Sequence, residues 1–245
     1  GENTEPRIAY RSGAAYAARL SRATEVLPTG SAIACDGAYL VTGGMGGLGI
    51  KVGAWLAEHG VARIVLVGRR VPSQEVQKAV ESWRQSGVEV ATISADVSRC
   101  DDVERVFASI EEAGHRLRGI IHAAGVIDDG LLRGQDWDRL ASVFEPKIKG
   151  TWNLHMQTQA LDLDFFVCFS SSTALFDAGG QASYAAANAY MDGLMHRRRL
   201  LGLPGLSINW GPWAEVGMAA ELSEASRRII EKRGWNSMAP AQALS

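Results

Sequence analysis

The sequence predicts an α/β fold in which a doubly wound parallel sheet carries helices on both faces. Short β-rich runs alternate with helical patterns from residue 38 to residue 209. This alternation is typical of parallel strands joined by right-handed helical crossovers. A glycine-rich loop separates the first strand of the series from the first helix. The length of 245 residues suffices for one large domain of this kind.

Composition excludes several classes of protein. The 25 basic and 27 acidic side chains give a formal net charge of -2, which offers no electrostatic case for binding nucleic acid. No run approaches the ~18 apolar residues that cross a bilayer, so we expect no membrane association. Cys35, Cys100 and Cys168 are too widely spaced for a disulfide framework or a metal site. We expect a soluble, cytoplasmic protein without structural metal.

The first thirty residues differ from the rest of the chain. Two short extended stretches, residues 7–11 and 15–20, flank Ser12 and Gly13 and predict a β-hairpin. Because two strands alone are marginally stable in water, we expect this hairpin to be the remnant of a larger sheet. Residues 27–37 contain Pro28, Gly30 and Gly37 and predict a linker. We therefore divide the chain into a remnant with its linker, 1–30, and a main domain, 31–245.

Each element of the main domain follows from a local pattern. Helices are predicted from apolar residues at helical spacing, one of them from Val76, Val80 and Trp83 behind Ser73 and another from Val103, Val106 and Ile110. The predicted strands are 38–41, 63–67, 88–94, 119–122, 165–169 and 206–209, and the helices include 48–58, material up to about 159, and 182–200. Ligands of such sheets bind beyond the carboxyl ends of the strands, so we expect the chemistry in those loops.

The loop after the first strand predicts a phosphate site. Glycines permit close backbone approach, and a helix N-terminus offers unpaired N–H groups to a pyrophosphate. The alternative is an ordinary turn, but the position between a strand and a helix favours a dinucleotide-binding loop. Its predicted cofactor contacts are Thr42, Gly43, Gly44, Gly46, Gly47, Leu48 and Gly49.

The end of the second strand indicates which dinucleotide binds. NAD sites place Asp or Glu about 20 residues after the loop, whereas this chain has Arg69 and Arg70 there. Arginine suits a 2′-phosphate because it is permanently charged and bidentate, which favours NADPH over two merely solvated arginines. Asp96 follows the third strand and is predicted either to accept from the adenine amino group or to be a turn residue.

Polar side chains near the fifth strand predict a reductase site. Tyr184 and Asn188 lie four residues apart and project from one face of a helix. A tyrosine can protonate a forming alkoxide if a nearby ammonium lowers its pKa from about 10. Position 188, four residues after the tyrosine, is not lysine, so the candidates are Lys147 and Lys149. The two point to opposite sides of a helix, and spacing alone does not choose between them.

With these residues in view, the chain resembles the ketoreductase domains of modular polyketide synthases, a branch of the short-chain dehydrogenase/reductases. The resemblance runs from about residue 7 to the end and implies a Rossmann-like fold. Its motifs are YLVTGGMGGLG, HAAGVIDDG, PKIKGTWNLH, FSSSTALFDAGGQASYAAANAYMDGL and SINWGPWAEVGMA. In this family the lysine and asparagine are interchanged relative to other short-chain reductases, which accounts for Asn188.

The resemblance implies a role for each catalytic residue. The family's lysine lies 24 residues before its serine, which selects Lys147, and its serine lies 13 before the tyrosine, which selects Ser171. Tyr184 is then the proton donor, Ser171 a hydrogen-bond donor to the carbonyl, and Lys147 the ammonium that lowers the tyrosine pKa and also contacts the nicotinamide ribose. Asn188 helps to hold that lysine or a relay water. The family uses the segment at His122 for packing and cofactor support rather than as a base. Further implied cofactor contacts are Val97, Ala123, Ala124 and Gly125.

The resemblance also implies a stereochemical class. Asp129 ends the segment Ile127-Asp128-Asp129, which looks like the B-type signature and implies a D-configured alcohol. Phe176 stands where A-type domains carry tryptophan, and Ala186 stands where epimerising B-type domains carry proline. Residues 211–233, helical from 221 to 232, are expected to form a lid over the acyl chain. In that lid Trp213 and Met218 are expected either to contact substrate or simply to pack.

The implied function is NADPH-dependent reduction of a β-ketoacyl thioester on the phosphopantetheine of an acyl carrier protein. Expected partners are that carrier protein and neighbouring synthase domains. Arg197, Arg198 and Arg199 are expected to form a solvated helix end rather than a carrier-protein contact. We expect the chain to be a partial segment of a megasynthase, incomplete at its C-terminus. The alternatives are a free-standing fatty-acid-type reductase and a non-catalytic ketoreductase-like domain.

Overall fold

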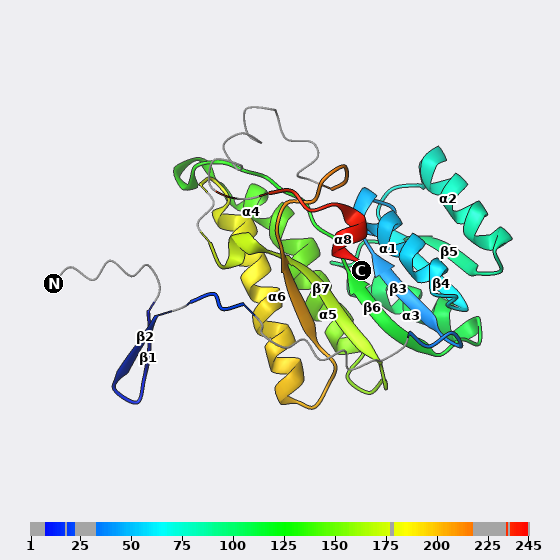
Figure 1. Ribbon diagram of the computed structural model, residues 1–245, viewed down its shortest axis with the longest axis horizontal. Helices are drawn as coiled ribbons and strands as arrows, with labels where there is room; N and C mark the ends of the chain where they lie inside the picture. The colour runs from blue at the N-terminus through cyan, green and yellow to red at the C-terminus, as the bar shows by residue number, and fades with distance from the viewer. Residues whose placement is uncertain are drawn as a thin grey trace. The chain divides into compact units, whose positions relative to one another are not determined.

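The computed structural model describes residues 8–17, 19–22, 33–176, 179–217, 234 and 236–244 (Figure 1). Contacts divide the chain into two compact units, Gly1–Ala32 and Ile33–Ser245. The first unit contains the expected antiparallel hairpin of β1 (Ile8–Arg11) and β2 (Ala14–Ala17). Positive φ angles at Ser12 (49°) and Gly13 (80°) match the two-residue turn that the twist of a hairpin favours. The second strand ends at Ala17, so the expectation that it reaches residue 20 is wrong.

The second unit is built on the predicted parallel sheet. Its strands run in the order β5-β4-β3-β6-β7-β8, and every neighbouring pair is parallel. The order reverses direction between β3 and β6, which is the switch point where such sheets bind ligands. The strands are β3 (Ala38–Thr42), β4 (Arg63–Gly68), β5 (Glu89–Ser94), β6 (Leu117–His122), β7 (Phe165–Ser171) and β8 (Leu206–Trp210).

Helices cover both faces of the sheet, as Figure 1 shows. Along β3, Ala38 and Leu40 face one apolar cluster, while Tyr39 and Val41 face the other, as the two-residue period of a strand requires. The first cluster packs against α3 (Cys100–Glu112), α5 (Gly150–Gln157) and α6 (Ala182–Leu200). The second packs against α1 (Gly47–Glu58), α2 (Gln74–Gln85) and α8 (Pro240–Ala243).

The helical stretch between β6 and β7 is more varied than the sequence predicts. It comprises the 3₁₀ turn η1 (Leu132–Gly134), α4 (Trp137–Phe144), the π-helix η2 (Glu145–Lys149) and α5. Pro146 lies inside it and has no N–H to donate to the helix ladder. The widened turn therefore falls at the proline, and π-turns of this kind are frequent at functional sites.

Arg198 corrects the expectation of a solvated end for α6. Its side chain is fully buried, and its guanidinium lies 4.6 Å from the ring centroid of Phe166. It donates to the carbonyl of Pro204 (2.7 Å), to His155 Nδ1 (2.9 Å) and to Thr158 Oγ1 (3.0 Å). Burial lowers the pKa of Arg198 to about 10. These bonds join the ends of α5 and α6, so the arginine is structural.

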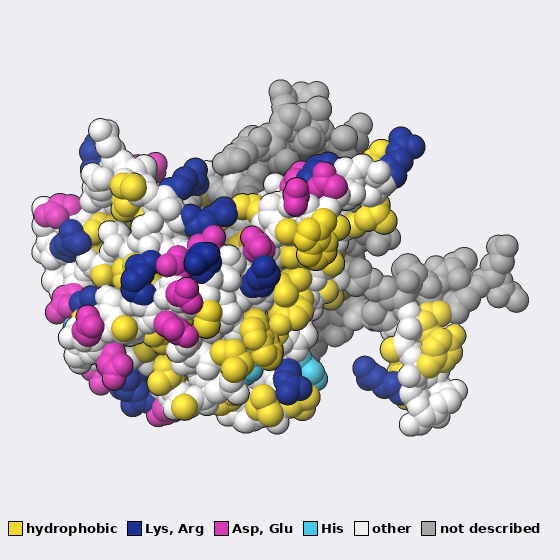
Figure 2. Space-filling view, turned by 180° about the vertical axis from the view of Figure 1, so that it is seen from behind, with side chains coloured by type: hydrophobic (Ala, Val, Ile, Leu, Met, Phe, Trp, Pro, Cys, Tyr) yellow, Lys and Arg dark blue, Asp and Glu magenta, His cyan; other side chains and the backbone are white. Residues whose placement is uncertain are grey.

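The outer face of α5 and α6 carries exposed apolar side chains. Figure 2 shows hydrophobic groups gathered on part of this side of the molecule, with charges of both signs over the rest. Large exposed apolar side chains of these helices include Trp152 and Met156 of α5, at 42% and 49% exposure, and Leu200 of α6, at 76%. Within the described ranges, no helix has both the length and the apolar character needed to cross a bilayer.

Candidate active site

The loop between β3 and α1 is too tight for side chains. A Cβ on Gly43, where φ is +67°, would lie 2.7 Å from the carbonyl oxygen of Ala123, and one on Gly49 would lie 2.4 Å from that of Gly43. A Cβ on Gly44 would lie 2.6 Å from the carbonyl oxygen of Val41. The glycines thus let the loop pack on itself and on the end of β6, where the sheet order reverses.

The N-terminus of α1 is open to an anion. Gly46 is its N-cap and makes no side-chain capping bond, and no acidic residue occupies the first turn. The first turn itself therefore offers no negative side chain to the positive end of the helix dipole. Val216 and Gly217 lie against this turn, because a Cβ on Gly47 would be 3.4 Å from Val216 and one on Gly217 would be 3.1 Å from Leu48.

Beyond β4 and β5 lie the predicted cofactor-selecting residues. Arg69 and Arg70 are both exposed. Asp96 is half-buried, and its Oδ1 accepts from the N–H (2.9 Å) and the hydroxyl (2.7 Å) of Ser98, as in an Asx turn. Val97 is buried in the apolar cluster below. The structure therefore supports the interpretation of Asp96 as a turn residue. A ligand would have to bind its other carboxylate oxygen, Oδ2.

Thr42 and His122 end adjacent strands and form a buried pair. They are partners in the β3–β6 register, with Thr42 Oγ1 2.6 Å from His122 Nδ1. Burial, followed by the charge of Lys147, lowers the pKa of His122 to about 3. The imidazole is thus neutral at physiological pH, in keeping with a packing role.

The structure distinguishes the two candidate lysines. Lys147 is 2% exposed, and its Nζ donates to the carbonyl of Phe169 (3.1 Å) and lies 5.2 Å from the ring centroid of Tyr184. A Cβ on Gly125 would lie 2.8 Å from Lys147 Cε, so the glycine makes room for this side chain. Lys149 is instead exposed and paired with Glu145 at 2.9 Å.

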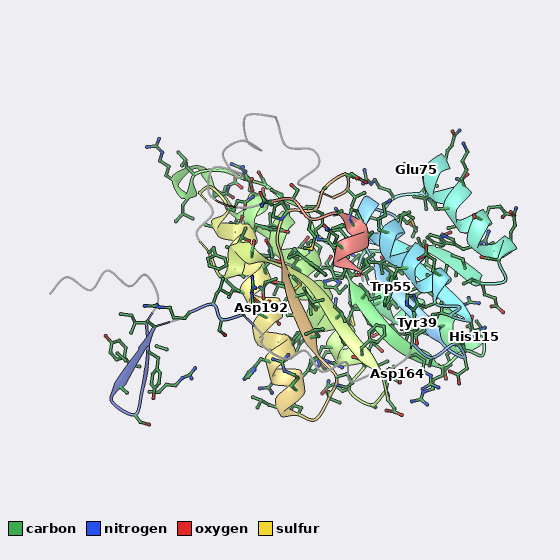
Figure 3. All side chains as sticks on the ribbon, in the orientation of Figure 1. Tyr39, Trp55, Glu75, His115, Asp164 and Asp192 are labelled. Carbon is green, nitrogen blue, oxygen red and sulfur yellow. The ribbon has the colours of Figure 1, made fainter. Side chains whose placement is uncertain are left out.

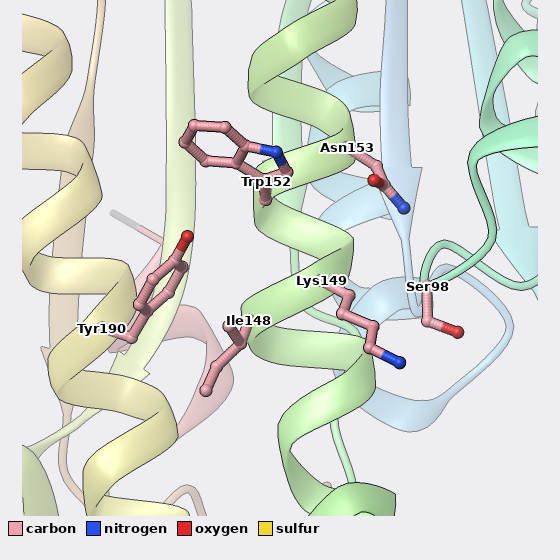
Figure 4. Close-up of a pocket in the computed structure, with 6 residues that line it drawn as sticks. All are labelled: Ser98, Ile148, Lys149, Trp152, Asn153 and Tyr190. Atoms are coloured by element: carbon pink, nitrogen blue, oxygen red, sulfur yellow. The ribbon is translucent and has the colours of Figure 1, made fainter.

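Lys149 lies by a separate groove on the other side of η2. Figure 4 shows its lining residues, with the Lys149 side chain directed toward Ser98. The groove is lined by Ser98, Ile148, Lys149, Trp152, Asn153 and Tyr190, none of them a predicted catalytic residue. The side chains of Lys147 and Lys149 thus point to opposite sides of the helix, as their spacing predicts.

Tyr184, Asn188 and Ser171 come together beside Lys147. Tyr184 is 8% exposed, and the Nδ2 of Asn188 donates to its carbonyl at 2.8 Å. The Oδ1 of Asn188 is buried and has no hydrogen-bond partner within the described segments. Ser171 Oγ accepts from the N–H of Thr173 (3.2 Å), which leaves its hydroxyl hydrogen free to donate elsewhere.

The charges of the site differ from the sequence expectation. Burial raises the pKa of Tyr184, while hydrogen bonding from Asn188 and Ser171 opposes that rise and the charge of Asp129 adds to it. Burial also lowers the pKa of Lys147 to about 8. The expected lowering of the tyrosine pKa by Lys147 is therefore not seen in the protein by itself, because desolvation dominates over the other effects.

Asp129 is tied to the start of α6. Its Oδ2 accepts from Gln181 Nε2 at 2.9 Å, and the N–H of Gly130 donates to the carbonyl of Gly180 at 2.8 Å. Arg139 forms an ion pair with the neighbouring Asp128 and donates to the Asp129 carbonyl at 3.0 Å. The aspartate thus stands near Tyr184 on a segment fixed by several bonds.

Three other predicted residues fall in different surroundings. Phe176 is half-buried just after the 3₁₀ turn η3 (Ser172–Ala174). Trp213 is 4% exposed and packs on Phe169 and Trp210, with ring centroids 6.1 and 5.0 Å away. Of the two expectations for Trp213, contact with substrate or packing, the structure therefore supports packing in the core. Met218 and residues 219–233 of the expected lid lie outside the described residues.

Sequence reasoning overlooked two residues behind the site. Asn209, in β8, donates from Nδ2 to the carbonyl of Ser171 (3.2 Å) and to Asp192 Oδ2 (2.8 Å). Asp192 lies eight residues after Tyr184, on the same face of α6. The available signals were that spacing and the place of Asn209 near the end of the last strand of the sheet.

Comparisons with known proteins identify the family of the chain. Residues 37–215 match the family described as KR domain. The chain is 46% identical over 195 residues to a phenolphthiocerol/phthiocerol polyketide synthase of Mycobacterium tuberculosis, covering 80% of this chain and 9% of that protein. It is 41% identical to polyketide synthase GfsB of Streptomyces halstedii, covering 100% of this chain and 4% of that protein.

Solved structures give the same result. An A-type ketoreductase from a modular polyketide synthase has a TM-score of 0.90 and 37% identity, covering 97% of this chain and 50% of that one. An A1-type ketoreductase has a TM-score of 0.91 and 36% identity, covering 99% and 51%. The chain thus spans about half the length of these structures and a small part of the curated synthases. With the family match extending over most of its length, the chain belongs to the KR domain family of ketoreductases found in polyketide synthases.

Proposed function

We propose that this domain uses NADPH to reduce a β-ketoacyl thioester, carried on the phosphopantetheine of an acyl carrier protein, to a D-configured β-hydroxyacyl thioester without epimerisation. The observation that supports it most is the buried Lys147 ammonium lying 5.2 Å from the Tyr184 ring centroid. That pair stands at the carboxyl ends of β6 and β7, on the same sheet edge as the glycine loop. Neighbouring synthase domains are the remaining partners of the proposal.

The residues of the loop and the strand ends fit the cofactor. A loop whose glycines leave no room for a Cβ, and a helix start without an acidic group or a side-chain cap, suit a pyrophosphate. Arg69 and Arg70 are exposed and follow directly after β4, and their guanidinium groups suit a 2′-phosphate. Ala123, Ala124 and Gly125 follow β6 and would border the bound nucleotide. When bound, NADPH supplies the hydride for the carbonyl carbon.

The chain's own groups act on the carbonyl oxygen. Ser171 donates its hydroxyl hydrogen to that oxygen. The Thr173 N–H does not compete for this hydrogen, because it donates to Ser171 Oγ. Tyr184 keeps its proton until the oxygen gains charge, because burial raises its pKa, and then transfers it. Lys147 stabilises the phenolate that forms, through an attraction that is strong in a buried site. Asn188 holds the tyrosine's helical turn.

The stereochemical part of the proposal rests on two residues. Asp129 is fixed by Gln181 beside Tyr184, where it can direct the phosphopantetheine arm to one side of the site. Phe176 takes the place of the tryptophan implied for A-type domains. The solved structures named above are A-type and A1-type ketoreductases, so the configuration of the product is the decisive observation.

The test is reduction of a diketide β-ketoacyl thioester by the purified chain. We expect loss of NADPH absorbance that depends on the thioester, little activity with NADH, and a D-configured alcohol by chiral chromatography. An L-configured alcohol would overturn the stereochemical assignment alone. No NADPH consumption, with the cofactor bound and the protein folded, would contradict the proposed activity and favour the non-catalytic alternative.

A further inference from the structure

We propose that Asp192 is a positioning residue for this site: it orients the Asn209 amide that holds the end of β7, and its carboxylate charge acts on Lys147. The inference deepens the proposed function and rests on it. Figure 3 labels Asp192, which lies in α6 one turn beyond Asn188. Its two carboxylate oxygens accept from Ser207 Oγ and from Asn209 Nδ2, both in β8.

The Asn209 amide is surrounded by acceptors. Its Nδ2 lies 2.8 Å from Asp192 Oδ2, 3.2 Å from the Ser171 carbonyl oxygen and 3.2 Å from Ser170 Oγ. Only the NH₂ end of the amide can face a carboxylate and a carbonyl. The carboxylate contact is the shortest and is charge-assisted, so Asp192 fixes which way the amide points.

The held segment is the one that presents the catalytic serine. Ser170 is 4% exposed, and its hydroxyl donates to the Asn188 carbonyl at 3.4 Å. In the β7–β8 register Ser170 is the partner of Asn209, and Ser171 follows at the strand end. The network therefore joins β7, β8 and α6 directly behind Ser171 and Asn188. Without Asp192 the amide is free to turn its oxygen toward the Ser171 carbonyl, which repels the strand end.

Burial lowers the pKa of Lys147, and interactions first with Cys168 and then with Asp192 act in the opposite direction. Among the residues that the structure describes, the titratable groups that act on Lys147 or face it are His122 from β6, Cys168 from β7, and Tyr184 and Asp192 from α6. Burial lowers the pKa of His122 to about 3 and raises that of Cys168 to about 12, so both are neutral between pH 6 and 10. Burial raises the pKa of Tyr184 as well. The interaction of the Asp192 side chain with Lys147 is therefore the part of the proposal that Asp192→Asn tests.

The experiment compares Asp192→Ala and Asp192→Asn with two controls in the whole chain. We expect Asp192→Ala to lower kcat for the β-ketoacyl thioester about tenfold or more, with the Kd for NADPH within about twofold of wild type. Asp192→Asn keeps the shape and one acceptor oxygen, so it should fold even if the alanine variant does not. With it, the alkaline limb of the kcat profile should move to lower pH.

The two controls test whether the effect is specific to Asp192: one removes a different hydrogen bond of this network, and the other removes a carboxylate elsewhere. Ser207→Ala removes the bond to the other carboxylate oxygen but leaves Asn209 held, so kcat should stay within about twofold. Asp164→Asn removes a carboxylate at the opposite end of β7, where it pairs with Arg118, and should leave both kcat and its pH profile unchanged. A kcat of Asp192→Ala equal to that of Asp164→Asn would overturn the proposal.

A second readout does not depend on turnover. With ¹³C at lysine Cε, NMR titration reports the pKa of Lys147 directly, assigned by its loss in Lys147→Met. We expect a lower pKa in Asp192→Asn than in wild type, because the opposing charge is gone. An unchanged titration would overturn the role of the charge. If wild-type protein reduced no thioester, the proposed function would fail, while this titration would still decide on Asp192.

Discussion

At the scale of single residues, the proposed mechanism assigns the proton transfer to Tyr184. Tyr184→Phe removes only the phenol oxygen from a side chain that is 8% exposed, so packing is retained. We expect kcat to fall about a hundredfold or more, with NADPH affinity little changed. Steady-state kinetics and cofactor fluorescence titration measure the two quantities. Near-normal turnover would remove the tyrosine from the mechanism.

Gly125 sets the position of the ammonium. In Gly125→Ala the new Cβ would lie 2.8 Å from Lys147 Cε and displace that side chain from Tyr184. We expect kcat to fall roughly 10- to 100-fold, because small misplacements of a catalytic group are costly. Gly134→Ala is the matched control, since a Cβ there meets nothing within 4 Å. Equal rates for the two variants would show that Lys147 has other room to move.

At the scale of elements, α6 offers a test of helix stability apart from the site. Gly193 lies inside this helix, and a Cβ there would meet nothing within 4 Å. Gly193→Ala should raise the free energy of unfolding by ~0.5–1 kcal/mol, because alanine loses less backbone entropy in a helix. Urea denaturation measures it. Gly60→Ala should do the reverse, since φ is +69° there and strains any side chain.

The elements also show what the sequence can predict. Alternating strands and helices predicted the sheet, and the confirmed topology follows from them because parallel strands leave few other arrangements. The placement of candidate residues was predictable where they share one helix, as Tyr184 and Asn188 do. It was not where distant segments meet: the contact of Asp192 with Asn209, 17 residues apart, depends on how α6 packs over β8. Arg198 was misjudged because its basic neighbours suggested solvent, whereas the return of the chain at Pro204 buries it.

For the whole molecule, buried bases make stability depend on pH. The pKa of His122 is about 3 in the folded protein and 6.5 as the ordinary value, so the unfolded chain binds the extra proton first. The stability from this group is complete above pH 6.5 and is lost as pH falls toward 3. The slope is about 1.4 kcal/mol per pH unit for one proton.

His122→Asn should flatten that slope, as measured by urea denaturation at several pH values. His196→Asn changes an exposed histidine of α6 and should leave the slope as it is. Burial lowers the pKa of His155 too, so part of the acid sensitivity should remain in His122→Asn. A slope identical to that of wild type would contradict a buried neutral His122.

Cofactor binding should also stabilise the molecule as a whole. A ligand at 100 times its Kd adds about 2.7 kcal/mol to the free energy of unfolding. We expect NADPH to raise Tm more than NADH at equal concentration, because Arg69 and Arg70 would meet the 2′-phosphate. Replacing both by Ala should raise the Kd for NADPH about 10- to 100-fold and leave that for NADH unchanged. Equal loss for both cofactors would contradict this role.

The π-turn at Glu145–Lys149 behaves as a one-residue insertion in an otherwise α-helical stretch. Deleting one residue from it would restore ordinary winding, but it would rotate everything on one side by about 100° relative to the other. Either Lys147 would leave Tyr184 or α5 would turn its apolar side away from the sheet. A shorter helix would therefore lose either the contact of Lys147 with Tyr184 or the packing of α5 on the sheet. We expect deletions of one residue in this helix to abolish activity.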